Sequence, residues 1–266
     1  MSMSLVYRST VAAIARLSRL ARLEHVKTHT FYAGQLSARS LVVDLGAHVG
    51  EFADEVRRRH GCRVLAVEAL PDLCACIATH PGIEVHNVAI SDSEGPVTLH
   101  LSANRECNSV DLSIATAFGY RGTVACEGLT LEGFLDRHGP GTIDLLKVDI
   151  EGAEGPMFSS TSDAVLKRAR QVSIEFHDFI RDSISTEEVR AIFERMERLG
   201  FHCLPFSYLH PGMRHADVLF IQHDAAQVRP LERVMFALIG LLLRAQDAKA
   251  RLALRLHLTP APGLLG

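Results

Sequence analysis

Acidic side chains gather in residues 145–154, which read L-L-K-V-D-I-E-G-A-E. Side chains alternate along a strand, so Asp149 and Glu151 point the same way where this apolar run ends. Gly152 permits a sharp turn, and Glu154 follows about one helical turn after Glu151. Carboxylates that converge in this way repel one another unless a cation, a metal ion or a proton relieves the charge. The segment therefore predicts a site for a positively charged ligand or for acid–base chemistry.

A second group of reactive side chains ends the apolar run that begins at Val172, where Glu175 and His177 share one face. An imidazole beside a carboxylate is a workable general base, because its pKa lies near neutrality. A hydroxyl that is to act as a nucleophile needs such a base, or a metal that lowers its pKa. Carboxylates with one His could also hold Mg²⁺ or Mn²⁺, whereas the sequence lacks the Cys and His spacing of a zinc site. The catalytic candidates are Asp149, Glu151, Glu154, Glu175 and His177, and no residue is assigned as a metal ligand.

A glycine-containing turn lies upstream, at residues 44–50, with the sequence D-L-G-A-H-V-G. It follows the apolar run 41–43 and precedes a helix-like stretch at 51–59, which is the order of a nucleotide-binding corner. A dinucleotide fingerprint reads G-x-G-x-x-G, but this turn begins with Asp44 and spaces its glycines as G-x-x-x-G. A carboxylate there would repel a pyrophosphate and suits a cation. Because S-adenosylmethionine carries an ammonium and a sulfonium and no phosphate, the turn predicts a site for this methyl donor.

The next apolar run, residues 63–68, ends in the carboxylate of Glu68. An acid at the tip of the second strand can accept both ribose hydroxyls of a nucleoside. Many solvated strand ends carry Glu, so this position is informative only together with the turn at 44–50. The alternative interpretation of both features is a structural glycine turn in an ordinary α/β domain.

The elements that must position these residues alternate along the middle of the chain. Strands are expected near 41–46, 63–68, 83–90, 143–149, 171–176, 202–207 and 216–222, and helices near 50–60, 71–79, 163–169 and 186–199. Such βα units predict a Rossmann-like, doubly wound α/β fold with a mostly parallel sheet. The last two strands are joined through Pro211 and Gly212, which is too short for a crossover helix and predicts an antiparallel edge hairpin. Residues 97–101 alternate like a half-exposed strand that could pair with 122–131.

Both ends of the chain predict amphipathic helices. The apolar face is expected to hold Val11, Ile14, Leu17 and Ala21 in residues 8–23, and Leu231, Val234, Leu238, Leu241, Leu242 and Leu252 in residues 231–258. Neither has the ~20 uninterrupted apolar residues of a membrane span. Each could pack on the domain, form a homodimer interface or make peripheral contact with an anionic membrane. We expect terminal appendages at 1–36 and 225–266 around a Rossmann-like domain at 37–224.

Composition bounds the remaining function classes. The 266 residues suffice for one α/β domain with additions. Net charge is -3, from 28 Lys and Arg against 31 Asp and Glu, so the overall charge of the chain does not favour binding of nucleic acid. The six cysteines form no C-x-x-C pair, and no signal-peptide pattern precedes them. They predict reduced thiols in a cytoplasmic protein.

Taken in order, the motifs resemble those of the FkbM-type methyltransferases over about residues 41–222. They are Asp44 to Gly50, Val67-Glu68, Ala89-Ile90-Ser91-Asp92 with Gly95, Asn108-Ser109, Thr130 to Leu135, Leu145 to Glu154, and Ile174-Glu175 with His177. The segment K-V-D-I-E-G-A-E is the most specific of these. The resemblance implies a Rossmann-like fold, S-adenosylmethionine as donor and usually a hydroxyl acceptor on a sugar or natural product.

The same resemblance implies roles for individual residues. Glu68 would bind the ribose, and Asp92 with its neighbours Ile90 and Ser91 would flank the adenine. Asp149 and the acids that follow it would face the methyl group and the acceptor. The expected donor-binding residues are Asp44, Gly46, Ala47, His48, Gly50, Glu68, Ala89, Ile90, Ser91 and Asp149. His48 stands where the family commonly has Asn, and Ala69 where Pro commonly follows the acid, but neither departure removes a charged contact.

The leading hypothesis is an S-adenosylmethionine-dependent O-methyltransferase whose acceptor is a hydroxyl of a glycolipid, polysaccharide or antibiotic-type natural product. One alternative is an NAD-dependent oxidoreductase, against which the charge of Asp44 and the missing first glycine argue. Another is a non-catalytic nucleoside-binding interaction protein that docks through its terminal helices. The expected partner is a small-molecule or glycan acceptor, with Mg²⁺ or Mn²⁺ kept as an alternative cofactor.

Overall fold

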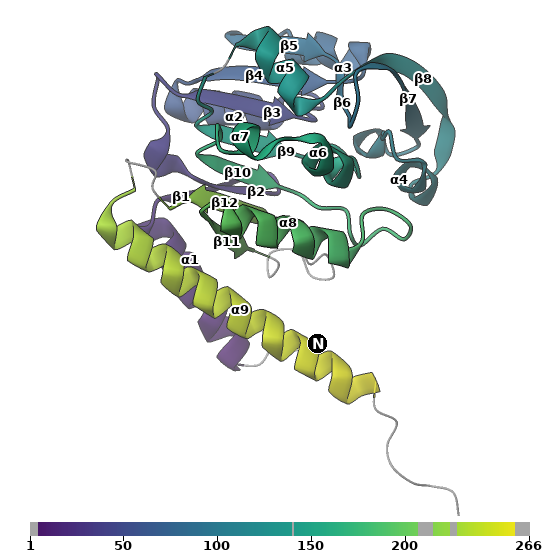
Figure 1. Cartoon of the computed structure of the whole chain (residues 1–266). Coiled ribbons are helices and arrows are strands. Elements are labelled where there is room, and N and C mark those ends of the chain that lie inside the picture. Colours follow the sequence, from purple (N-terminus) through teal and green to yellow (C-terminus); the bar gives the residue numbers. More distant parts are fainter. Residues whose placement is uncertain (1–4, 140, 207–214, 224–227, 259–266) are drawn as a thin grey trace, which may run out of the picture.

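A seven-stranded sheet forms the centre of the computed structural model, which describes residues 5–139, 141–206, 215–223 and 228–258 (Figure 1). In the order β11-β12-β10-β9-β3-β4-β5, its strands are Phe201–Pro205, Val218–Gln222, Gln171–Ile174, Leu145–Val148, Leu41–Leu45, Arg63–Glu68 and Ile83–Asn87. The strands from β10 to β5 pair in parallel, whereas β12 runs antiparallel to β10 and β11. The predicted fold class and its edge hairpin are confirmed, while Pro211 and Gly212 lie outside the described residues.

Helices cover both faces of this sheet because its central strands are apolar on both sides. Val43 and Leu45 of β3 face one layer, and Val42 faces the other. The first layer contains α5 (Leu131–His138), α6 (Glu154–Ser160), α7 (Asp163–Leu166) and α8 (Thr186–Arg198), and the second contains α2 (Glu51–His60) and α3 (Pro71–Ile77). This doubly wound arrangement buries the sheet and leaves the carboxyl ends of its strands for a ligand.

Side-chain caps fix where several helices begin. The hydroxyl of Ser185 accepts the N–H of Glu188, and the Glu188 carboxylate accepts the N–H of Ser185, which is a capping box at the start of α8. Thr130 caps α5 by accepting the N–H of Gly133. The sequence patterns do not predict α4 (Leu112–Ala117), α5 or α6, although they do predict α3 and α7, which are no longer than α5.

A three-stranded sheet lies beside the carboxyl ends of the main sheet (Figure 1). It consists of β6 (Ala89–Ile90), β7 (Gly95–Ser102) and β8 (Tyr120–Leu129). The antiparallel pairing of β7 with β8 confirms the pairing expected between residues 97–101 and 122–131. The single strand expected at 83–90 is wrong, because the chain leaves the main sheet after β5 and β6 pairs with β8 instead. A turn of 3-10 helix, η2 (Arg105–Cys107), follows β7.

Two helices from opposite ends of the sequence, α1 (Leu5–Leu20) and α9 (Pro230–Leu258), lie side by side next to the β11–β12 edge (Figure 1). Ile14 of α1 and Phe236 of α9 are buried together with Leu219 of β12. Packing on the domain is therefore one function of these helices. A homodimer interface, membrane contact and the boundaries 1–36, 37–224 and 225–266 stay predictions. Of the described helices, none is both long and apolar enough to cross a bilayer.

The apolar face predicted for α9 is wrong in its rotation. Leu231, the first residue of that face, is 69% exposed, and Val234, Leu238 and Leu241 are exposed with it. Leu242 does pack on the domain as predicted, and the side chain of Leu252 lies outside the described residues. The face that packs on the domain instead holds Met235, Phe236, Ile239 and Leu243. A helix with leucines on most of its circumference does not reveal from its sequence which side meets the protein.

A two-stranded hairpin, β1 (Leu23–Val26) and β2 (His29–Tyr32), was not expected from the sequence and is followed by η1 (Ala33–Gln35). Four residues per strand give too short a pattern to recognise. The backbone N–H of Thr30 donates to the buried carboxylate of Asp217, at 2.9 Å, and ties β2 to the main sheet. The hairpin thereby brings His29 to the edge at which the central strands end.

Candidate active site

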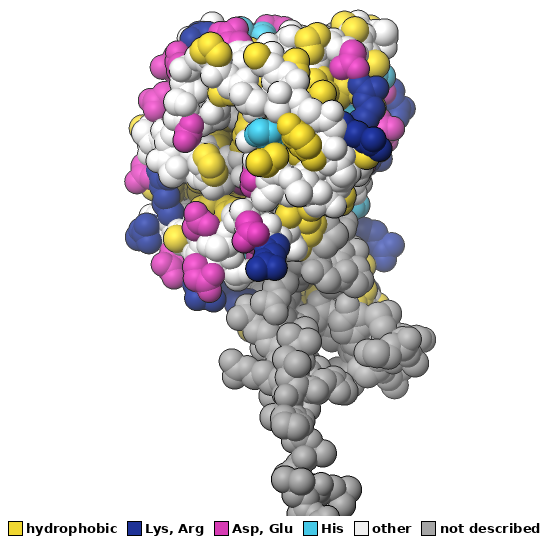
Figure 2. Space-filling model, turned by 90° about the vertical axis from the view of Figure 1, so that its right-hand side faces the viewer, with side chains coloured by type: hydrophobic (Ala, Val, Ile, Leu, Met, Phe, Trp, Pro, Cys, Tyr) yellow, Lys and Arg dark blue, Asp and Glu magenta, His cyan; other side chains and the backbone are white. Residues whose placement is uncertain are grey.

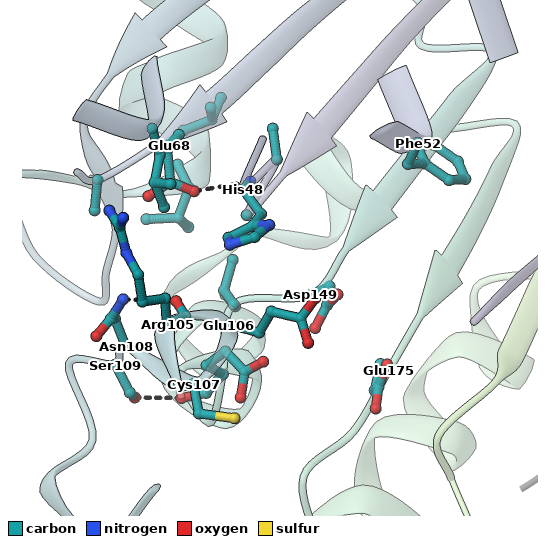
Figure 3. A pocket seen from close by; sticks show the side chains of 18 of the residues that line it. His48, Phe52, Glu68, Arg105, Glu106, Cys107, Asn108, Ser109, Asp149 and Glu175 are labelled. Carbon is teal, nitrogen blue, oxygen red and sulfur yellow. Dashed lines mark hydrogen bonds between the residues drawn. The ribbon is translucent and has the colours of Figure 1, made fainter. Parts of the chain in front are cut away.

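A cavity of about 530 Å³ opens where β3, β4, β9 and β10 end. Figure 2 shows the face on which these strand ends lie: hydrophobic side chains gather near its centre, with charged side chains around them. The close view in Figure 3 shows Glu68 and His48 on one side of the cavity, Asp149 and Glu175 farther along, and the residues of η2 opposite. The volume lies in the range of small-molecule and cofactor sites.

Most of the predicted donor-binding residues line this cavity. They are Gly46, Ala47, His48, Glu68, Ala89, Ile90 and Asp149. Asp44, Gly50 and Ser91 do not belong to its wall. Gly50 is the N-cap of α2, with φ of 86°, and the hydroxyl of Ser91 donates to Asp92. The roles of the lining residues toward a donor stay predictions.

Gly46 is required by the protein's own backbone. Its φ is 75°, and a Cβ at this position would lie 1.7 Å from the carbonyl oxygen of Asp149. Only glycine lets the end of β3 come this close to the end of β9. A glycine in a nucleotide-binding turn is expected to let a ligand approach the backbone, and Gly46 also lets a neighbouring strand approach.

Asp44 does not face the cavity but lies beneath it. Its side chain is fully buried, and Nζ of Lys147 lies 3.1 Å from Oδ1 of Asp44. Lys147 also donates to the carbonyl oxygen of Gly46 at 2.7 Å. Burial alone would lower the pKa of Lys147, but the carboxylates of Asp44 and Asp149 raise it above its ordinary value. The direct repulsion between Asp44 and a pyrophosphate that the sequence suggests does not fit this geometry, because Lys147 neutralises the charge.

Glu68 presents a fixed carboxylate at the tip of β4. The N–H of His48 donates to Oε2 and the N–H of Leu70 donates to Oε1, each at 2.9 Å (Figure 3). Burial raises the pKa of Glu68, and these two N–H groups counteract the rise. Two carboxylate oxygens have about four acceptor positions, so both can still accept ribose hydroxyls. His48 itself has φ of 50°, a left-handed conformation that Asn tolerates better than His does.

Asp149 sits between two positively polarised groups at the floor of the cavity. Oδ2 of Asp149 lies 3.5 Å from Nζ of Lys147 and 3.5 Å from Nε2 of His29. Burial opposes ionisation here, but Lys147 and then His29 hold the pKa of Asp149 well below its usual range. Asp149 therefore carries a negative charge at neutral pH, where it can face a cationic ligand.

His177 is held between two carboxylates. Its Nδ1 lies 3.0 Å from Oε1 of Glu154, and its Nε2 lies 3.1 Å from Oε2 of Glu151. Burial alone would lower the pKa of His177, but Glu154 and Glu151 raise it well above the ordinary value. The ring is then protonated at neutral pH, which suits a proton-holding ion pair and not a general base. Glu154 is fully buried beneath His177 and does not line the cavity.

Glu175 has the properties of a general base. It lines the cavity at the end of β10 and is 8% exposed. Burial, followed by the nearby charge of Asp149, raises the pKa of Glu175 to about 8. A carboxylate with a pKa near the working pH is a better base than an ordinary one, because it binds the proton more strongly. Of the two side chains predicted to share a face here, Glu175 is therefore a better candidate for the general base than His177.

Two overlapping groups in this part of the described chain could hold a metal ion. They are His29, Asp149 and Glu175, and Asp149, Glu151 and His177. In each group the potential ligand atoms lie within 4.8 Å of one another. His177 is already bound to two carboxylates, and Asp149 to Lys147, so an ion would have to displace existing ion pairs.

Comparison with known families agrees with this geometry. Residues 44–203 match the methyltransferase FkbM domain, and the match spans the glycine turn, Glu68, Asp149 and His177. The chain belongs to the FkbM methyltransferase family. Methyltransferases of this family take their methyl group from S-adenosylmethionine, which is therefore the donor of this FkbM protein. The cavity fits that cation, because acids at its floor face a site whose other end carries the Glu68 carboxylate.

Individual relatives are distant. The AMB antimetabolite synthetase AmbE of Pseudomonas aeruginosa is 24% identical over 201 residues, which cover 61% of this FkbM chain and 9% of that protein. A precorrin-6y C5,15-methyltransferase from Geobacter metallireducens is 12% identical, with a TM-score of 0.38 over 70% of this chain and 80% of its own. An rRNA methylase from Streptococcus thermophilus is 12% identical, with a TM-score of 0.40 over 83% and 96%. The family assignment rests on the domain match and not on these likenesses.

Sequence reasoning missed Lys147 and His29. Lys147 has a detectable signal, because a lysine inside the buried strand β9 must have a partner. Lys147 is the first residue of the motif K-V-D-I-E-G-A-E, and a match to the motif does not identify the partner of its charge. His29 lies on the short strand β2, and nothing in its local sequence marks it.

Proposed function

We propose that this FkbM protein is an O-methyltransferase that acts on a hydroxyl of a sugar or natural product. The observation that carries the proposal is the Glu175 carboxylate, whose pKa of about 8 suits proton abstraction and which lines the same cavity as Glu68. An alcohol is a poor nucleophile until a base takes its proton. A methyltransferase for an already nucleophilic atom would have less need of such a base.

The residues divide the work between donor and acceptor. Glu68 would accept the ribose hydroxyls, and Ala89 and Ile90 would flank the adenine. S-adenosylmethionine, when bound, supplies an electrophilic methyl group. Asp149 would place its negative charge near the sulfonium, and Glu175 would take the proton of the acceptor hydroxyl. The acceptor oxygen forms its bond to the methyl carbon as the sulfur–carbon bond breaks, so the reaction needs mainly alignment.

The acceptor is proposed from chemistry that surrounds the cavity. The polar segment of η2 supplies Arg105, Glu106 and Asn108 to one wall (Figure 3). A polyhydroxylated acceptor would find hydrogen-bonding partners there. An NAD-dependent oxidoreductase is less consistent with the site, because the turn at residues 44–50 lacks the G-x-G-x-x-G spacing of a dinucleotide fingerprint. A binding protein without turnover does not need a carboxylate whose pKa is raised toward neutrality, as that of Glu175 is.

Calorimetric titration with S-adenosylhomocysteine, with NAD in parallel, tests the donor site. Methyl transfer from labelled donor to a panel of sugars and hydroxylated natural products tests the reaction. We expect micromolar binding of the homocysteine product, no binding of NAD, and label on a hydroxyl oxygen. Repeating both with EDTA and with Mg²⁺ decides whether an ion takes part. Donor binding with label only on nitrogen or carbon acceptors would contradict O-methylation while leaving the donor site intact.

A further inference from the structure

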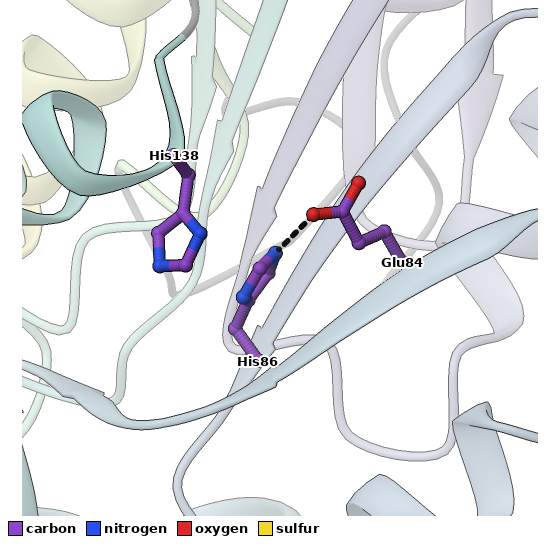
Figure 4. A group of neighbouring side chains, drawn as sticks. All are labelled: Glu84, His86 and His138. Carbon is purple, nitrogen blue, oxygen red and sulfur yellow. Dashed lines mark ion pairs between the residues drawn. The ribbon is translucent and has the colours of Figure 1, made fainter.

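Three potential metal ligands lie together at the sheet edge opposite to α9. Glu84 and His86 project from the same side of the edge strand β5, and His138 is the last residue of α5 (Figure 4). Their ligand atoms all lie within 4.8 Å of one another, and Nε2 of His86 is 3.2 Å from Oε1 of Glu84. None of the three lines the donor cavity. The group is therefore separate from the methyltransferase site.

The chemistry of this group is that of a transition-metal site. Two imidazoles and one carboxylate are the ligand set of zinc sites that keep a fourth position for water. Mg²⁺ and Ca²⁺ prefer oxygen ligands alone, so they are poorer candidates. A tetrahedral ion with bonds of about 2.0–2.1 Å spaces its ligands about 3.4 Å apart. Glu84 and His86 already have this separation, and His138 has to close the remaining distance by a side-chain rotation.

Neighbouring side chains orient the three potential ligands. Arg63 donates to Oε2 of Glu84 at 2.7 Å, which leaves Oε1 directed toward His86. The Phe134 ring packs 5.2 Å from the His86 ring and 4.7 Å from the His138 ring. Such outer contacts orient metal-binding imidazoles.

The buried Nε2 of His86 faces Oε1 of Glu84 at 3.2 Å, without the alignment of a good hydrogen bond (Figure 4). A buried imidazole nitrogen that is only partly satisfied is unfavourable. A metal ion at this point would satisfy that nitrogen, the Glu84 oxygen and His138 together. We propose that Glu84, His86 and His138 form a binding site for Zn²⁺ or a similar transition-metal ion that fastens α5 to the edge strand β5.

Titration with Zn²⁺ alone, competed against a chromophoric chelator, tests this site. The decisive variant is His138→Gln, because His138 lies at a helix end and its replacement leaves the strands intact. The matched control is His223→Gln: its ring stacks on His202 at 3.5 Å, and this pair belongs to no described group of metal ligands. We expect one Zn²⁺ to bind the wild type and the control. Affinity in His138→Gln should fall by at least about 100-fold, since the loss of outer-shell partners alone costs 10–100-fold.

The acids of the donor cavity could also attract Zn²⁺, so the titration is repeated with saturating S-adenosylhomocysteine. Binding at the sheet edge should not change, whereas competition with the product would place the ion in the cavity and overturn the proposal. Thermal melting gives an independent readout. Zn²⁺ should raise the Tm of the wild type and of His223→Gln but not that of His138→Gln. Equal Zn²⁺ affinity in wild type and His138→Gln would also overturn the proposal.

Discussion

The ammonium of Lys147 lies 3.1 Å from Oδ1 of Asp44, and both side chains are almost fully buried. The pair joins the ends of β3 and β9 beneath the donor cavity. A second carboxylate, that of Asp149, shares the same ammonium from the cavity side at 3.5 Å. Lys147 thus connects a structural carboxylate to one that faces the ligand, and removing it disturbs both.

Replacing Lys147 with Met should therefore lower the free energy of unfolding by about 3–5 kcal/mol, because it leaves the buried Asp44 charge without a partner. Urea denaturation measures the loss. The double variant Lys147→Met with Asp44→Asn should recover part of it, since no buried charge then remains unpaired. Strictly additive losses in the double variant would show that the two residues do not interact.

Glu68→Ala should weaken binding of S-adenosylhomocysteine by about 10²- to 10⁴-fold, since two hydrogen bonds to a charged group are lost and each contributes about 1.5–3 kcal/mol. Calorimetry gives the affinity. The control is Glu127→Ala on β8, whose carboxylate lies on the surface in an ion pair with Arg137. Unchanged affinity in a folded Glu68→Ala protein would remove the ribose assignment.

Glu175→Gln should lower kcat by about 10²- to 10⁴-fold, the usual contribution of a general base, while donor affinity is retained. The amide keeps the shape of the side chain but cannot take a proton. Steady-state kinetics with whichever acceptor of the panel takes up label gives kcat, and calorimetry with S-adenosylhomocysteine gives donor-site affinity, which separates the two effects. A comparable loss in Glu127→Gln would point to a general effect on folding, and full activity of Glu175→Gln would assign the base elsewhere.

The pH profile follows from the same carboxyl group. Glu175 acts as a base only when it is ionised, and its pKa is raised to about 8 by burial and then by Asp149. The rate kcat/KM should therefore increase as pH rises toward about 8 and level off above it. An ordinary Glu would give a constant rate over this range, so a flat profile between pH 6 and 9 would contradict the assignment.

Glu232 makes stability depend on acid pH. It is 1% exposed at the start of α9 and accepts hydrogen bonds from Arg229, Arg22 and Tyr32. Burial opposes ionisation, but these donors lower the pKa of Glu232 to about 2. Its contribution is fully present above its unfolded pKa and is lost as pH falls from about 4.5 toward about 2.

The difference between these pKa values corresponds to about 3 kcal/mol of stability near neutral pH. Glu232→Gln should lose about that amount at pH 7 by urea denaturation, and the gap to the wild type should narrow as pH falls below about 4. A gap that is independent of pH would mean that packing and not charge is responsible.

How much the sequence predicts depends on the range over which each signal acts. The strands β3, β4, β9 and β10 and the helix α8 were all predicted, because their patterns are local and long enough to read. The hairpin of β1 and β2 was not, because its stability comes from distant partners: Thr30 bonds to Asp217, and the Tyr32 N–H bonds to Gln171. Nothing near those residues in the sequence marks these contacts.

For the candidate site, the sequence predicts the positions of the residues but not their protonation states. The motifs place Asp149, Glu151, Glu175 and His177 at the carboxyl ends of β9 and β10, and all four line the cavity. The motifs do not say which of the four is charged. The ion pair with buried Glu154 favours the protonated form of His177, and the ion pair with Lys147 favours the ionised form of Asp149. These two partners come from positions that the sequence pattern does not connect to the residues they control.

The two edges of the main sheet are protected from other chains in different ways. The described part of α9 packs beside β11, whereas no described strand pairs with the outer side of β5. An open edge of this kind is a template for pairing with another chain unless charges or a bound group discourage a visiting strand. The ion pair of Glu84 with Arg63 lies at this edge and supplies such charges.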